Sequence, residues 1–272
     1  MGDMRSEPKN EKVEPADPAS IFEEVQIARL PETEASRDAL RHESGNWKEQ
    51  SIPALQRKVV DAELANLHRG IIAPVYASLI HTLKQIPLAE FSLLDAACAS
   101  GFYSEVIRML DKRNIHYAGS DYSRAMVDMA RSLYPDEHFE VQDLTSLTYD
   151  VKSIDVVLLS GVLEHIPDYE KALQEACRVA KKYVILHRLP FTDHSENEYT
   201  LGSQYSIKTP RIYFARKVLL ADLERHHPFL SHEQDSYPAT RKLRDQWKLR
   251  LKVFLGLESA GRQTKTLLLS RR

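Results

Sequence analysis

From Phe91 onward, short apolar runs alternate with amphipathic segments of helical length, and this alternation constrains the fold more than any other feature of the sequence. Strands are expected at 93–97, 116–121, 139–142, 154–160 and 183–187, with a last strand at 264–270. Helices are expected at 103–113 and 169–180, and from about 124, where Ser123 can serve as the N-cap. This order predicts a doubly wound, mostly parallel α/β sheet with right-handed crossovers.

Segments outside this alternation predict the domain organisation. Residues 1–20 are rich in Pro, Glu, Lys and Asp and are expected to form a flexible tail. Residues 21–88 are expected to form an N-terminal helical extension or lid, with two helices broken at Gly70–Pro74. The core is then 89–272, with a polar loop at 188–210, a helix near Ile212–His226 and an inserted helix at 241–255. The apolar stripe of that inserted helix is expected to pack on the domain or on a second copy of the chain, as in a homodimer, in preference to a membrane surface or an anionic lipid-linked substrate.

Composition narrows the classes of function. A net charge of −2 argues against a broadly basic nucleic-acid-binding protein. Apolar runs stay well short of the roughly 18 residues that an integral membrane helix needs, and the first residues lack a secretory apolar segment. Two cysteines are too few for a disulfide framework, so the reducing cytoplasm is the expected location.

A strand, turn and helix at residues 93–106, LLDAACASGFYSEV, carry the most chemical information. The strand ends in Asp95, and small residues up to Gly101 let the backbone approach a ligand at the helix N-terminus. Asp121 ends the second strand, where an acidic side chain can accept hydrogen bonds from both hydroxyls of a ribose. Asp143 follows the third strand and could border an adenine ring. The G-x-G-x-x-G pattern of NAD-binding proteins is absent, which disfavours a dinucleotide.

From Leu93 to about Arg188 the sequence resembles the class I S-adenosylmethionine-dependent methyltransferases, in LLDAACASGFYSEV, GSDYSRAMVDMAR and the run from IDVVLLSGVLEHIPD to EACRVAKKYVIL. The resemblance implies a Rossmann-like sheet of seven strands with an antiparallel last strand, and S-adenosyl-L-methionine as the cofactor. Carried across, the family's cofactor-binding positions are Asp95, Ala97, Gly101, Asp121, Tyr122, Asp143, Leu144 and Ser160.

The chain departs from the family where glycines are usual, since Ala97 and Ala99 stand there. An alanine forced to a positive φ would cost about 1–2 kcal/mol. A methyltransferase-like scaffold that binds cofactor or a partner without catalysis is therefore the alternative to an enzyme.

Methyl transfer requires the acceptor atom to be aligned with the methyl group, and the enzyme need not supply a nucleophile. For a hydroxyl acceptor a base would help, and His165 and His187 are the candidates at the carboxyl edge of the sheet. The alternative for His165 is a structural or cofactor-flanking role. A metal bound by Glu164, His165 and Asp168 is disfavoured, because adjacent side chains diverge on a strand.

The segment 188–210 is expected to overhang the acceptor pocket, unless it is a solvated surface loop. Arg188 could pair with a carboxylate or phosphate of the substrate, and Tyr199 and Tyr205 would form walls. NWKEQSIPALQRKVVDAEL and VILHRLPF are similar to bacterial methyltransferase-like proteins associated with surface-polysaccharide or natural-product pathways. We therefore expect methyl transfer to a small-molecule or glycan-precursor acceptor, at a hydroxyl group.

Overall fold

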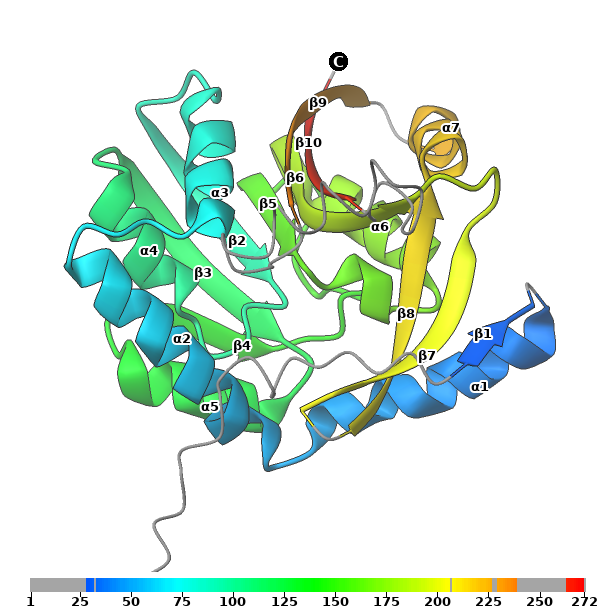
Figure 1. Cartoon of the computed structure of the whole chain (residues 1–272). Coiled ribbons are helices and arrows are strands. Elements are labelled where there is room, and N and C mark those ends of the chain that lie inside the picture. Colours follow the sequence, from blue (N-terminus) through cyan, green and yellow to red (C-terminus); the bar gives the residue numbers. More distant parts are fainter. Residues whose placement is uncertain (1–27, 32, 206, 227–228, 239–262, 272) are drawn as a thin grey trace, which may run out of the picture.

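A central, mostly parallel sheet organises the computed structural model, which describes residues 28–31, 33–205, 207–226, 229–238 and 263–271 (Figure 1). The strand order β4-β3-β2-β5-β6-β10-β9 includes one strand, β10, that runs antiparallel to both of its neighbours. This arrangement confirms the predicted seven-stranded sheet with an antiparallel last strand. Its strands are β2 (Glu90–Ala96), β3 (Asn114–Asp121), β4 (His138–Val141), β5 (Ile154–Ser160), β6 (Ala180–Thr192), β9 (Phe229–Pro238) and β10 (Gln263–Arg271).

Both faces of this sheet are covered by helices, which explains why its strands read as continuous apolar runs. Leu93 and Leu94 are adjacent on β2, yet they belong to separate core clusters on opposite faces, because successive strand side chains alternate. The covering helices are α3 (Pro74–Lys84), α4 (Tyr103–Leu110), α5 (Arg124–Leu133), α6 (Tyr169–Val179) and α7 (Arg216–His226). Ser123 caps α5 as predicted, its hydroxyl accepting from the N–H of Met126.

Strand β6 is longer than predicted and joins two sheets. Its first part pairs with β5 and β10, and its end at Phe191 and Thr192 pairs with β8 (Ile207–Ala215). β8 pairs in turn with β7 (Glu198–Gln204), and β7 with β1 (Ala28–Leu30). The predicted loop 188–210 is therefore wrong, and only 193–197 connects β6 to β7. The helix expected near Ile212 begins at Arg216, because residues 212–215 belong to β8.

N-terminal helices run along one side of the sheet, as predicted for the extension. They are α1 (Glu34–Ser44), the short 3-10 helix η2 (Gly45–Lys48) and α2 (Ile52–His68), which is separated from α3 at Gly70–Pro74. α1 packs against β8, and α2 packs against α5 (Figure 1). None of the helices that the structure describes is long and apolar enough to cross a membrane. The predicted tail 1–20 and the predicted helix 241–255 lie outside the described residues.

Candidate cofactor and acceptor site

The loop after β2 follows a left-handed path despite its alanines. Ala97 has a φ of 81° and Ala99 a φ of 49°. The backbone N–H groups of Ala97 and Cys98 both donate to the carbonyl oxygen of Ser120 at the end of β3, at 2.7 and 2.8 Å. Each alanine therefore carries about 1–2 kcal/mol of backbone strain, which is the cost expected from the sequence for an alanine at a positive φ.

Gly101 and Ser100 complete the loop and fix it against its neighbours. Gly101 has a φ of 76°, and a Cβ added there would lie 2.7 Å from the ring of Phe139. No side chain fits at this position without displacing that ring. The hydroxyl of Ser100 donates to Oε1 of Gln56 on α2 at 2.8 Å, and both side chains are buried. The N-terminal extension thus contacts the loop directly.

Asp121 lies beside this loop at the carboxyl end of β3. Its Oδ2 accepts from the N–H of Ala99 at 2.8 Å and its Oδ1 from the N–H of Ser123 at 2.9 Å. Burial raises the pKa of this carboxyl to about 6, although the N–H donors act in the opposite direction. Near neutral pH the side chain is an ionised acceptor whose two oxygens are already oriented by the backbone.

Asp95, at the end of β2, is completely buried. Its Oδ2 accepts from the hydroxyl of Tyr117 at 2.7 Å, whereas its Oδ1 has no hydrogen-bond partner among the described residues. Burial, and then the charge of Asp121, raise the pKa of Asp95 to about 7. An unsatisfied buried acceptor is expensive, so this oxygen marks a place for one more donor.

The residues predicted to flank an adenine differ in their surroundings. Tyr122 is 39% exposed, and the Nζ atom of Lys48 lies 3.7 Å from the centre of its ring. Asp143 is exposed, and its Oδ1 accepts from both the N–H and the hydroxyl of Thr145. Leu144 is buried in the core. These contacts leave the Tyr122 ring as the accessible flat surface next to Asp121.

Solved methyltransferases share this fold. Magnesium protoporphyrin IX methyltransferase from Synechocystis PCC 6803, solved with bound S-adenosylmethionine, is 15% identical with a TM-score of 0.53, over 89% of this chain and 100% of that one. An S-adenosylmethionine-dependent methyltransferase from Methanosarcina mazei is 13% identical with a TM-score of 0.53, over 74% of this chain and 98% of that one. At such identities the likeness establishes the fold alone.

A sequence profile described as a methyltransferase domain matches residues 94–187, the segment that contains the loop and Asp121. The ubiquinone biosynthesis O-methyltransferase of Coxiella burnetii is 28% identical over 115 residues, which are 41% of this chain and 47% of that protein. A ubiquinone/menaquinone biosynthesis C-methyltransferase of Campylobacter jejuni is 25% identical over 114 residues, 40% of this chain and 48% of that protein. The chain spans about half the length of the curated relatives it matches.

Over residues 94–187 the chain is thus similar to a methyltransferase domain.

His187 is enclosed at the end of the β5–β6 pair. It is 1% exposed, and its Nδ1 lies 2.9 Å from the hydroxyl of Ser160, which donates to the Tyr103 hydroxyl at 3.1 Å. Burial, and then the charge of Arg188, lower the pKa of His187 to about 3. A buried, weakly basic imidazole does not fit the expected role of general base. Its contacts indicate that it positions Ser160 and, through it, Tyr103.

His165 contacts the N-terminal extension and strand β8. It lies in the 3-10 helix η3 (Leu163–His165), and its Nδ1 is 2.8 Å from the carbonyl oxygen of Pro210, so that nitrogen carries the proton and donates. Its ring meets the ring of Trp47 at 4.8 Å between centroids. These contacts support the structural alternative stated for His165. Among the described residues, no group of three or more potential ligand side chains is placed to hold a metal.

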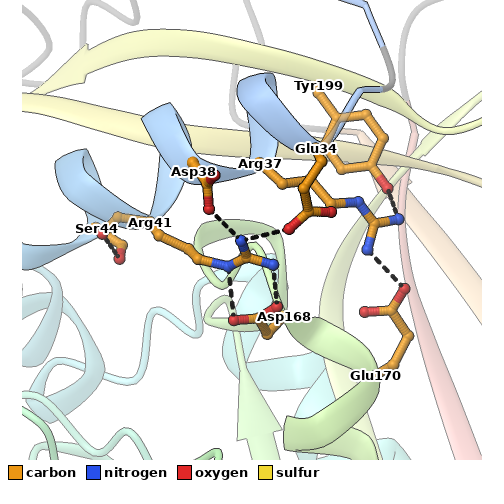
Figure 2. Close-up of polar contacts among 8 residues, drawn as sticks. All are labelled: Glu34, Arg37, Asp38, Arg41, Ser44, Asp168, Glu170 and Tyr199. Atoms are coloured by element: carbon orange, nitrogen blue, oxygen red, sulfur yellow. Dashed lines mark hydrogen bonds and ion pairs between the residues drawn. The ribbon is translucent and has the colours of Figure 1, made fainter.

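Figure 2 shows how α1 engages two residues that the sequence associated with the site. Arg41 donates through Nε and Nη2 to both oxygens of Asp168, at 3.0 and 2.9 Å. Arg37 donates to the hydroxyl of Tyr199 at 3.2 Å and to Glu170 at 3.4 Å. Tyr199 is 1% exposed. It therefore anchors α1, and its role as a wall of the acceptor pocket stays a prediction.

The other two predicted acceptor residues are Tyr205, which lies beside the loop after β2, and Arg188 on β6. Tyr205 follows β7 with a φ of 51° and packs with Ile52, Met126 and Ala99, which places it over the loop. Arg188 is exposed and follows His187 directly at the carboxyl edge.

Three supporting residues were not predicted from the sequence, namely Gln56, Tyr103 and Tyr117. Only Tyr103 carried a usable sequence signal, because it opens the helix that follows the cofactor loop.

Proposed function

We propose that this chain transfers a methyl group from S-adenosylmethionine to a small-molecule acceptor. The observation that carries the proposal is the Asp121 carboxylate, held at the end of β3 by the N–H of Ala99 in the left-handed loop. Ligands of doubly wound sheets bind at this carboxyl edge. The matching methyltransferase profile covers the same residues.

The residues present fit the cofactor. Asp121 would accept from the ribose hydroxyls, and the unpaired Oδ1 of Asp95 fits a donor on the amino-acid part. Tyr122, Asp143 and Leu144 would flank the adenine, while Ala97, Gly101 and Ser160 would border the rest. When bound, the cofactor supplies an electrophilic methyl group on a sulfonium.

The chain's own contribution is then to hold the acceptor and exclude water. Gln56 on α2 and Trp47 on η2 bring the N-terminal extension over the loop, which supports its role as a lid. Alignment of the acceptor can lower the barrier by several kcal/mol without a protein base, on the order of the effect known for intramolecular reactions. This suits a site whose two histidines are both engaged in structural contacts.

The finer predictions stay open to experiment. The relatives' names refer to quinone biosynthesis and to a magnesium porphyrin, which favours a small organic acceptor here. A hydroxyl acceptor, a glycan precursor, a homodimer and a cytoplasmic location remain predictions from the sequence.

Calorimetric titration with S-adenosylmethionine and S-adenosylhomocysteine, with NAD as a control ligand, tests the proposal. We expect micromolar binding of both sulfur nucleosides and its loss in Asp121→Asn, which keeps the shape but removes the charge. Asp128→Asn, an exposed residue on α5, is the matched control and should bind as the wild type does. Absence of binding up to millimolar concentration would overturn the proposal and favour the scaffold alternative.

A further inference from the structure

Two left-handed residues lie at the acceptor side of neighbouring strands, one just after the end of β5 and one within β6. β5 ends at Ser160 and is followed by Gly161, with a φ of 61°; in β6, Arg188 has a φ of 65°. The N–H of Gly161 donates to the carbonyl oxygen of His187 at 2.9 Å, and this hydrogen bond links the residue after β5 to the residue before Arg188. Because β5 and β6 run parallel, both residues emerge at the edge that carries Asp121.

Gly161 makes room for the side chain of Arg188. A Cβ at Gly161 would lie 3.2 Å from both the guanidinium carbon and Nε of Arg188, and 3.3 Å from Nη1. The guanidinium therefore lies back against the end of β5 instead of extending away from the protein. Arg188 nevertheless remains exposed, so a ligand at this edge can reach it.

Backbone strain is concentrated around this side chain. Among the described residues, five other than glycine have a positive φ, and only Lys152 of these lies away from the carboxyl edge. The remaining four are Ala97, Ala99, Arg188 and Tyr205. A residue with a side chain costs about 1–2 kcal/mol in this conformation, and such strain tends to persist at ligand sites. At Arg188 the left-handed backbone is what directs the guanidinium onto Gly161.

Aromatic side chains from two helices surround the same position. The positive charge of Arg188 acts on the hydroxyls of Tyr76 on α3 and Tyr103 on α4, where it opposes the rise in pKa caused by burial. Both hydroxyls are engaged: Tyr76 donates to Glu63 at 2.7 Å, and Tyr103 accepts from Ser160. The two rings meet edge to face at 6.0 Å. Both side chains are buried, 1% and 3% exposed, and their polar ends are already satisfied, so they belong to the protein core near the cation.

We propose that Arg188 binds an anionic group of the methyl acceptor, so that the substrate class is a small organic molecule bearing a carboxylate or a phosphate. The planar guanidinium fork matches both a carboxylate and a phosphate. The inference rests on the proposed methyl-transfer function. It makes Arg188 a specificity-determining residue that contacts the acceptor beside Ser160.

The test uses the full chain saturated with S-adenosylhomocysteine and titrated calorimetrically with benzoate, phenyl phosphate and the neutral analogue benzamide. We expect at least one anion to bind about tenfold or more tightly than benzamide, because a hydrogen bond to a charged group is worth about 1.5–3 kcal/mol. The stronger of the two anions then identifies the group. Arg188→Gln should weaken the anion about tenfold or more while leaving S-adenosylhomocysteine affinity unchanged.

Two further variants make the result specific. Arg188→Lys keeps the charge but loses the fork, and should bind the anion with intermediate affinity. Arg108→Gln, which removes the same charge from an exposed position on α4, should bind it like the wild type. The inference is overturned if neither anion binds better than benzamide, or if Arg188→Gln binds the anion as well as the wild type. Failure of S-adenosylhomocysteine itself to bind would instead refute the proposed function, so failure of the proposed function and failure of the Arg188 inference give different results.

Discussion

Replacing Ala97 by glycine should leave the protein as stable as before or make it more stable, although such a change in a helix destabilises. At a φ of 81° the alanine carries about 1–2 kcal/mol of strain that glycine relieves. Two effects destabilise the variant. Glycine has greater conformational freedom in the unfolded chain, which costs about 0.4–1 kcal/mol, and the loss of one partly buried methyl group costs up to about 0.8 kcal/mol. The middle of each range gives an increase of about 0.4 kcal/mol in the free energy of unfolding, and the extremes run from about −0.8 to about +1.6 kcal/mol.

Ala62→Gly is the matched control, since Ala62 is exposed in the middle of α2. Glycine there should destabilise by about 1 kcal/mol. Equilibrium unfolding in urea, monitored by circular dichroism, gives both free energies under one condition. The reasoning would be refuted if Ala97→Gly lost as much stability as Ala62→Gly, because the loop would then not hold a left-handed alanine.

Gly101→Ala should destabilise the protein by about 2–5 kcal/mol, which is the sum of the left-handed penalty and the overlap with the Phe139 ring. Gly45→Ala is the control and should change stability little, because Gly45 has a φ of −62° and open space around it. Thermal unfolding of both variants compares them, and a loss below about 1 kcal/mol for Gly101→Ala would contradict the close contact. Because the folded-state pKa of Asp95 is raised to about 7, its contribution to stability is present in full below the unfolded pKa of about 4 and is lost as pH rises through about 7. Asp95→Asn cannot ionise and so does not suffer that loss. The free energy of unfolding of the variant, relative to that of the wild type, should therefore increase by up to about 4 kcal/mol from pH 4 to pH 8 in urea titrations. A difference that does not depend on pH would show that the pKa of the Asp95 carboxyl is not raised.

The parallel core was predictable because its strands are buried on both faces and carry few polar residues. β5 begins and ends at the predicted Ile154 and Ser160, and the break between α2 and α3 falls where Gly70 and Pro74 indicate. In each case one local property, apolar continuity or a backbone breaker, decides the structure.

The β7–β8 hairpin was not predictable in the same way. Its strands carry polar residues and Pro210, and Glu198 and Thr200 are buried because α1 and the core cover the hairpin. That covering comes from residues more than a hundred positions earlier, which no local pattern records. Position alone likewise suggested His187 as a base, while its burial depends on how Tyr103 and Ser160 pack around it.

The place of β10 has a consequence for how the protein matures. This strand is made late in synthesis, yet it lies between β6 and β9 and supplies hydrogen bonds to both. Until it inserts, the nascent domain presents two open strand edges, the kind of surface that recruits other chains. Pairing of segments so distant in sequence is also slow. We therefore expect a chain cut before residue 263 to lose the pairing that joins β9 to the sheet.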